Sequence, residues 1–346
     1  GESAHAGFAV GWLALASYVF GCAAVANGIA AYLGHFSPAL GSVAATKAVA
    51  ALSIALLGLL NYRGVVPGAR ASNIFATAKL LPLVALALVG LPHIELASLW
   101  PQAPARWEGF GPACFLAYFA FQGFEAVPVP SGEAVNPRRD VPLAISLALI
   151  LSALLYMALQ AAATTLLPDL ASSSRPLADL AAVLFGPWGA GLIALTASVS
   201  MLGFTASAAL VGPRYLVALV EDGHLPSSLA RPHPKFASPY QAVALTTVLA
   251  LAAALAFDFK RLVDFSNIAV CAQYLSTCAA LPFLRRNPSP GAWQLPGGLL
   301  LPAAGVLATL LLGLQGSFRE IGVAAALLVA GFLVRNAILK SHANSH

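Results

Sequence analysis

The sequence predicts an all-α integral membrane protein that forms a single transmembrane domain of ten helices. Of its 346 residues, 59% are hydrophobic and only 9% are charged, whereas a soluble domain carries about 25% charged residues. The hydrophobic residues gather in long apolar stretches, and crossing a bilayer requires about 20 such residues. The net charge of +5 comes from cations dispersed between these stretches. We therefore expect a lipid bilayer as the surroundings and no nucleic acid partner.

The apolar stretches follow one another along the whole chain, and loops rich in Pro, Gly and charged residues separate them. They cover residues 6–33, 42–60, 74–92, 110–130, 141–167, 187–213, 240–256, 264–284, 298–314 and 319–339. The first stretch is too long for a cleavable signal peptide and lacks a basic leader. The four cysteines lie inside apolar stretches, so we expect free buried side chains rather than disulfides.

The distribution of basic residues predicts the orientation in the membrane. If the chain starts in the cytoplasm, most of the 18 Lys and Arg residues fall in the cytoplasmic loops and the C-terminal tail. Cytoplasmic loops of membrane proteins carry such an excess of Lys and Arg. We therefore expect a cytoplasmic C-terminus and a location in the inner (plasma) membrane of a bacterium.

Residues 118–145 depart from the pattern of an apolar helix. Gln122, Gly123 and Glu125 interrupt the apolar stretch, and two prolines follow. Gly and Pro break helices, and a carboxyl group at membrane depth marks a functional site. A broken helix is tolerated there only where its free backbone groups face protein or a wet cavity. We therefore expect an interruption between Phe121 and Glu125 and place the substrate site there, with a plain proline kink as the alternative.

Three other stretches carry polar residues. Lys79 lies a few residues inside its span and is either a lysine that reaches the cytoplasmic interface or a buried functional amine. Residues 187–213 are rich in small side chains, which favours close helix packing with substrate contact as a second possibility. Residues 264–284 begin with Asp264 and Asn267, which we expect to cap the outer end of that helix, and continue with further polar side chains.

No sequence motif indicates an enzyme or a cofactor. The chain has no Walker loop, no dinucleotide fingerprint, no HExxH and no GxSxG. The histidines of the loop at residues 224–233 lack the spacing of metal ligands, so we expect no metal site and no cofactor.

The ordered set of motifs resembles the amino acid permeases of the amino acid–polyamine–organocation (APC) superfamily. The motifs are FAFQGFEA at 119–126, E-x-x-N-P-x-R-x-x-P-x-A-I at 133–145, KLLP at 79–82, PR at 213–214 followed by EDGHLP at 221–226, and LPGG at 295–298. Each motif is weak alone, but together they cover the chain in the right order.

The resemblance implies a LeuT-like fold with two inverted five-helix repeats around a site at the middle of the membrane, in which two helices are broken. Aligned in this way, residues 6–33 correspond to the third family helix, 110–130 to the sixth and 187–213 to the eighth. The chain then corresponds to a fold truncated at the N-terminus, without the first two family helices. We expect such a chain to insert in a membrane without completing the substrate site.

The resemblance also assigns roles to individual residues. Phe119 falls where the family has an aromatic gate, and the unwound segment comprises Ala120, Phe121, Gln122, Gly123 and Phe124. Tyr18 and Ser200 face the substrate in this register. Glu125 falls on a glutamate linked in some members to proton sensing. Lys79 falls on a lysine that takes the place of a sodium ion in proton-coupled members.

The resulting hypothesis is a secondary active transporter of amino acids that works by alternating access, with coupling to protons or exchange of substrates. A carrier of polyamines or other organic cations is the alternative within transport. A non-transporting membrane remnant or sensor is the alternative from another class.

Overall fold

The computed structural model describes residues 2–64, 69–97, 99, 107–126, 136–285 and 297–343, and every regular element in these ranges is helical. The α-helices are α1 (Glu2–Leu33), α2 (Val43–Tyr62), α3 (Ala69–Gly90), α4 (Phe110–Ala120), α5 (Pro137–Leu166), α6 (Pro176–Glu221), α7 (Tyr240–Ala256), α8 (Phe259–Leu284), α9 (Leu300–Gly313) and α10 (Phe318–Ala343). Each overlaps one of the predicted apolar stretches.

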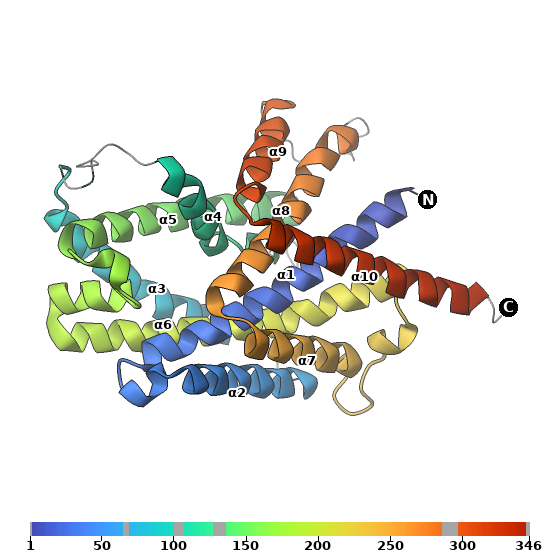
Figure 1. The fold of residues 1–346 in the computed structure, drawn as a ribbon, viewed down its shortest axis with the longest axis horizontal. Coiled ribbons are helices and arrows are strands. Elements are labelled where there is room, and N and C mark those ends of the chain that lie inside the picture. The colour runs from blue at the N-terminus through green and yellow to red at the C-terminus, as the bar shows by residue number, and fades with distance from the viewer. Residues whose placement is uncertain are drawn as a thin grey trace.

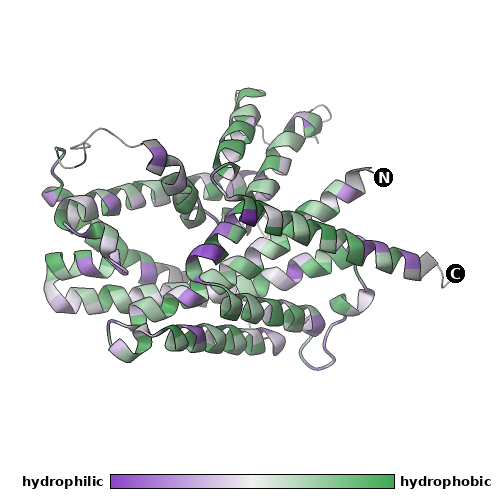
Figure 2. Ribbon diagram, in the orientation of Figure 1, coloured by the Kyte–Doolittle hydropathy of each residue, from purple (hydrophilic) through white to green (hydrophobic). Residues whose placement is uncertain are grey.

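Among the described residues, six helices are long and apolar enough to cross a membrane, namely α1, α2, α5, α6, α8 and α10. The apolar parts of α3, α4, α7 and α9 are shorter. Many large hydrophobic side chains on the outside of the helices are exposed, including Leu52, Leu151, Met157 and Val248. Figure 2 shows hydrophobic residues along most of the helices, with hydrophilic residues on α8 near the centre of the view. Such outer surfaces suit a lipid environment and support the integral membrane class.

Helix α1 lies at the centre of the fold and packs against α2, α6, α7, α8 and α10 (Figure 1). Its buried face is rich in alanine: Ala23, Ala24, Ala26 and Ala30 are all fully buried. Small side chains let neighbouring helices approach closely, so this composition explains how one helix contacts so many others.

Helix α6 is longer than the predicted span, because a first segment precedes a break at Gly186 and the second segment continues past the predicted end at residue 213 to Glu221. Gly186 has φ +74° and ψ −170°, a conformation that favours glycine. Pro187 opens the second segment, where its missing N–H and fixed φ are suited to the first turn of a helix. The predicted start of the span at residue 187 therefore coincides with this second segment.

The start of α8 corrects one prediction. Asp258 caps the helix by accepting a hydrogen bond from the backbone N–H of Arg261 at 2.9 Å, so Asp264 and Asn267 do not cap it. Asp264 instead accepts from Lys260 Nζ at 2.9 Å. Asn267 is fully buried in the helix interior. The four cysteines are free, as predicted.

Candidate functional site

The backbone leaves the helical conformation directly after α4. The helix ends at Ala120, and the N–H groups of Phe121 and Gln122 bond to the carbonyls three residues earlier. Gly123 has φ +116°, and a single 3-10 turn, η4 (Phe124–Ala126), follows. This is the segment in which the sequence led us to expect an interruption. The two prolines after it, at positions 128 and 130, lie outside the described residues.

The side chain of Gln122 connects this interrupted segment to α8. Its Nε2 donates to Asn267 Oδ1 at 2.6 Å, and its Oε1 accepts from Ser266 Oγ at 3.3 Å. Asn267 Nδ2 in turn donates to the Phe115 carbonyl of α4 at 2.6 Å. Ser266 Oγ also lies 3.2 Å from the Ser17 carbonyl of α1. Three helices therefore meet in one network of hydrogen bonds.

Glu125 forms a second connection to α8. Its Oε2 accepts from the backbone N–H of Gly123 and from the Tyr274 hydroxyl, both at 2.8 Å. The Tyr274 ring lies against Phe124 and Tyr118, with ring centroids 5.3 and 5.7 Å away. A partly buried carboxylate needs such donors, and here one donor comes from the break and the other from α8.

Other polar atoms around this junction are buried without a hydrogen-bond partner among the described residues. They are the hydroxyls of Tyr18 and Tyr118 and the Oε1 atom of Gln273. Each of them still has a polar neighbour just outside hydrogen-bond geometry: Tyr18 and Gln273 lie beside Tyr215, and Tyr118 lies beside Cys271. Polar side chains are therefore concentrated around the junction.

The other predicted substrate residues lie around the same segment. Phe119 packs against the buried cluster formed by α1, α2, α6, α7 and α8. The Ala120 carbonyl accepts from the Tyr156 hydroxyl at 3.2 Å, and the Phe121 ring contacts the Tyr156 ring at 5.3 Å. The structure therefore brings Tyr18 and the segment from Phe119 to Glu125 together at one junction.

Two predicted residues lie outside this network. Ser200 is half-buried in α6 and makes no hydrogen bond with a described side chain of the junction. Lys79 is half-buried and makes no hydrogen bond or ion pair with a described residue. It lies four and seven residues before Leu83 and Leu86, which pack with α5 and α6, so it belongs to the helix face turned toward those helices.

The sequence drew attention to α8 but did not assign its residues to the site. Ser266 and Asn267 precede Gln273 and Tyr274 by seven residues each, which places the two pairs on one face, two turns apart. That spacing is the sequence signal that could have identified α8 as a wall of the site.

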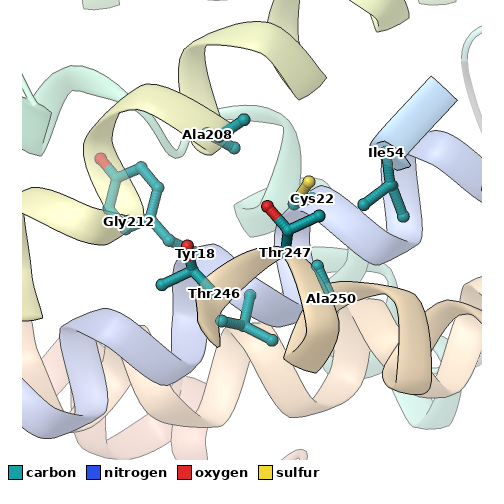
Figure 3. Close-up of a pocket in the computed structure, with 10 residues that line it drawn as sticks. Tyr18, Cys22, Ile54, Ala208, Gly212, Thr246, Thr247 and Ala250 are labelled. Atoms are coloured by element: carbon teal, nitrogen blue, oxygen red, sulfur yellow. The ribbon is translucent and has the colours of Figure 1, made fainter. Parts of the chain in front are cut away.

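A small cavity lies beside this junction between α1, α2, α6 and α7. Figure 3 shows Tyr18 and Cys22 of α1 beside Gly212 of α6 and Thr246 and Thr247 of α7. Its volume of about 20 Å³ is room for about one water molecule, which is too small for an amino acid. A larger hollow of about 380 Å³ is lined by the end of α6 and the loop that follows, including Arg214 and Glu221.

Comparison with known proteins identifies the family. The amino acid permease family model matches residues 3–334. The chain is 26% identical over 325 residues to the branched-chain amino acid permease of Bacillus subtilis, covering 88% of this chain and 70% of the relative. It is 26% identical over 295 residues to the methylthioribose transporter of Bacillus subtilis, covering 81% and 64%.

A human relative, cationic amino acid transporter 4, is 29% identical over 305 residues, covering 82% of this chain and 48% of the relative. These relatives are transporters rather than enzymes. The match over nearly all of its length shows that this chain belongs to the amino acid permease family of the APC superfamily.

Proposed function

We propose that the protein is a secondary active transporter that moves amino acids across the membrane by alternating access. The observation that carries this proposal is the hydrogen-bonded junction of the α4 break with α8 through Gln122 and Glu125. A carrier needs polar groups at membrane depth that can exchange partners, and a broken helix supplies backbone groups and side chains of this kind. The matching relatives include carriers named for branched-chain and for cationic amino acids.

In this proposal the substrate binds beside the segment from Phe119 to Glu125. Backbone N–H groups that the break after α4 leaves without helical partners would attract a substrate carboxylate. Phe119 covers the substrate as an aromatic gate, and Tyr18 contributes its hydroxyl. No covalent chemistry is involved, so substrate selection depends on shape, hydrogen bonding and charge.

Proton coupling is a further part of the proposal. Glu125 is held by one backbone N–H and by Tyr274, so a change in its protonation alters its hold on α8. Lys79 faces the α5–α6 side of the bundle and would release and regain a proton during the cycle. Proton release or binding by either residue makes uptake depend on pH. Exchange of one substrate for another does not require a proton.

The test is uptake of labelled leucine and arginine by the complete gene product reconstituted in proteoliposomes, with and without a pH gradient. We expect saturable uptake that unlabelled amino acids compete away. Gln122→Leu should reduce this uptake strongly, whereas Gln160→Leu should not, because Gln160 is exposed on α5 and its described side-chain bond is to Thr164 of the same helix. Uptake of polyamines without amino acids would favour an organic-cation carrier. Absence of any saturable uptake would refute transport.

A further inference from the structure

The hydrogen bonds of Asn267 have only one consistent direction. The Phe115 carbonyl can only accept, so Asn267 must turn its Nδ2 toward it. Its Oδ1 therefore faces Gln122, which must present its Nε2. The Gln122 Oε1 atom then faces the Ser266 hydroxyl, which can donate its one proton to this atom or to the Ser17 carbonyl. A backbone carbonyl of α4 thus determines the orientation of the Gln122 side chain through one residue of α8.

Asn267 is also well placed to hold the interrupted segment. It is completely buried, with 0% of its surface accessible. Both of its partners belong to α4 or to the turn that follows it, on either side of the point where the helix ends. Its two bonds therefore connect the last turns of α4 to the first residues after the break.

We propose that Asn267 is a positioning residue of the transport cycle, which docks the interrupted segment on α8 by orienting Gln122. The docked arrangement presents Gln122 Oε1 toward Ser266 and keeps residues 121–126 against α8. Release of the Gln122–Asn267 bond frees the segment to follow the substrate. This inference rests on the proposed function for its role in transport, but the docking itself does not require transport.

Hydrogen exchange of the backbone amides of residues 121–126, in detergent and without substrate, tests the docking. We expect Asn267→Leu to accelerate exchange by about tenfold or more. The loss of a partner for a buried polar group shifts the equilibrium from the docked to the released segment by about this factor. The control is Asn61→Leu, which removes a similar bond from α2 to the Ala209 carbonyl at 2.6 Å and should leave these residues unchanged. Equal exchange in Asn267→Leu and wild type would overturn the proposal.

The pair can be tested further by a double-mutant cycle. If Asn267 acts through Gln122, the double variant Gln122→Leu/Asn267→Leu should exchange no faster than the faster of the single variants. If the acceleration factors of the two single variants multiply in the double variant, their free-energy effects are independent. Asn267 would then stabilise the helix without Gln122, which would overturn the role assigned to Gln122.

Asn267→Asp provides a test that remains informative if the leucine variant does not fold. An ionised aspartate cannot donate to the Phe115 carbonyl, whereas a protonated aspartic acid can donate to it and still accept from Gln122. We expect uptake, expressed as a ratio to wild type at each pH, to stay near one in acid, where the aspartic acid is protonated, and to fall severalfold once the pH is high enough to ionise this buried carboxyl. A ratio that is reduced equally at every pH, acid included, would overturn the donor role. Altered exchange in Asn267→Leu without uptake by the wild type would refute the proposed function but retain the docking.

Discussion

Gly123 offers a direct test of whether the interruption after α4 depends on its backbone conformation. Its φ of +116° is one that residues with a side chain rarely adopt, and a Cβ added at this position would meet nothing within 4 Å. Gly123→Ala therefore introduces backbone strain without a steric clash. Gly203 of α6 is a matched control, because a Cβ added there also meets nothing within 4 Å and its φ is not positive.

The two substitutions should change the free energy of unfolding in opposite directions. A non-glycine residue held in an unfavourable φ region costs about 1–3 kcal/mol, which corresponds to a factor of roughly 5–150 in an equilibrium constant. Gly203→Ala should instead stabilise the protein by about 0.4–1 kcal/mol, because alanine restricts the unfolded chain and suits a helix.

The assay compares the free energies of unfolding and the uptake rates of the two variants under identical conditions. Gly123→Ala should lower the free energy of unfolding, or reduce uptake if the segment relaxes into another conformation. Gly203→Ala should preserve uptake. If Gly123→Ala proves as stable and as active as Gly203→Ala, the positive φ is not needed, and the reasoning about the interruption fails.

Three further predictions concern single contacts. Tyr274→Phe removes the hydroxyl that donates to Glu125 at 2.8 Å and should lower the free energy of unfolding by about 1–2 kcal/mol, measured by denaturant titration. Lys47→Met removes the Nζ donor to the Ala254 and Phe257 carbonyls at the end of α7 and should cost about 1–3 kcal/mol in the same assay, while an unchanged midpoint would contradict the bonding. Burial and a nearby arginine lower the pKa of His224 in the loop after α6, so stability should be highest above about pH 6.5 and fall as the pH decreases, because the unfolded chain then binds more protons. His224→Gln should flatten this dependence in thermal unfolding at pH 5 to 8, and an identical pH profile in the two proteins would refute it.

The positions of the helices could be predicted because the bilayer imposes a minimum apolar length and the loops contain Pro, Gly and charge. The change in backbone direction after α4 was also accessible, since Gly123 and two polar neighbours interrupt an apolar stretch. The boundaries were less accurate. Helix α8 begins at Phe259, five residues before the predicted start, because Asp258 and not Asp264 supplies the capping carboxylate.

The role of α8 in the site could not be predicted from local pattern. Gln122 and Asn267 are separated by 145 residues, and polar side chains in a membrane helix are compatible with capping, packing or a site. Only the packing of α8 against α1 and α4 brings its polar side chains to the junction of the candidate site. For Lys79, the sequence position left open a lysine that reaches the interface or a functional amine, and only the family resemblance favoured the amine. The described contacts leave Lys79 outside the hydrogen-bonded network, so its role stays a prediction.

Ser266 has one proton and two oxygens within reach. Its hydroxyl can donate a hydrogen bond to the Ser17 carbonyl of α1 or to the Oε1 atom of Gln122, which follows α4. The two distances are nearly equal, at 3.2 and 3.3 Å. A hydroxyl carries a single donor, so satisfying one oxygen leaves the other dependent on a different partner. The two arrangements differ by the exchange of one hydrogen bond for another. The central helix and the interrupted helix compete for the same donor, so a displacement of either one redistributes bonding at the other.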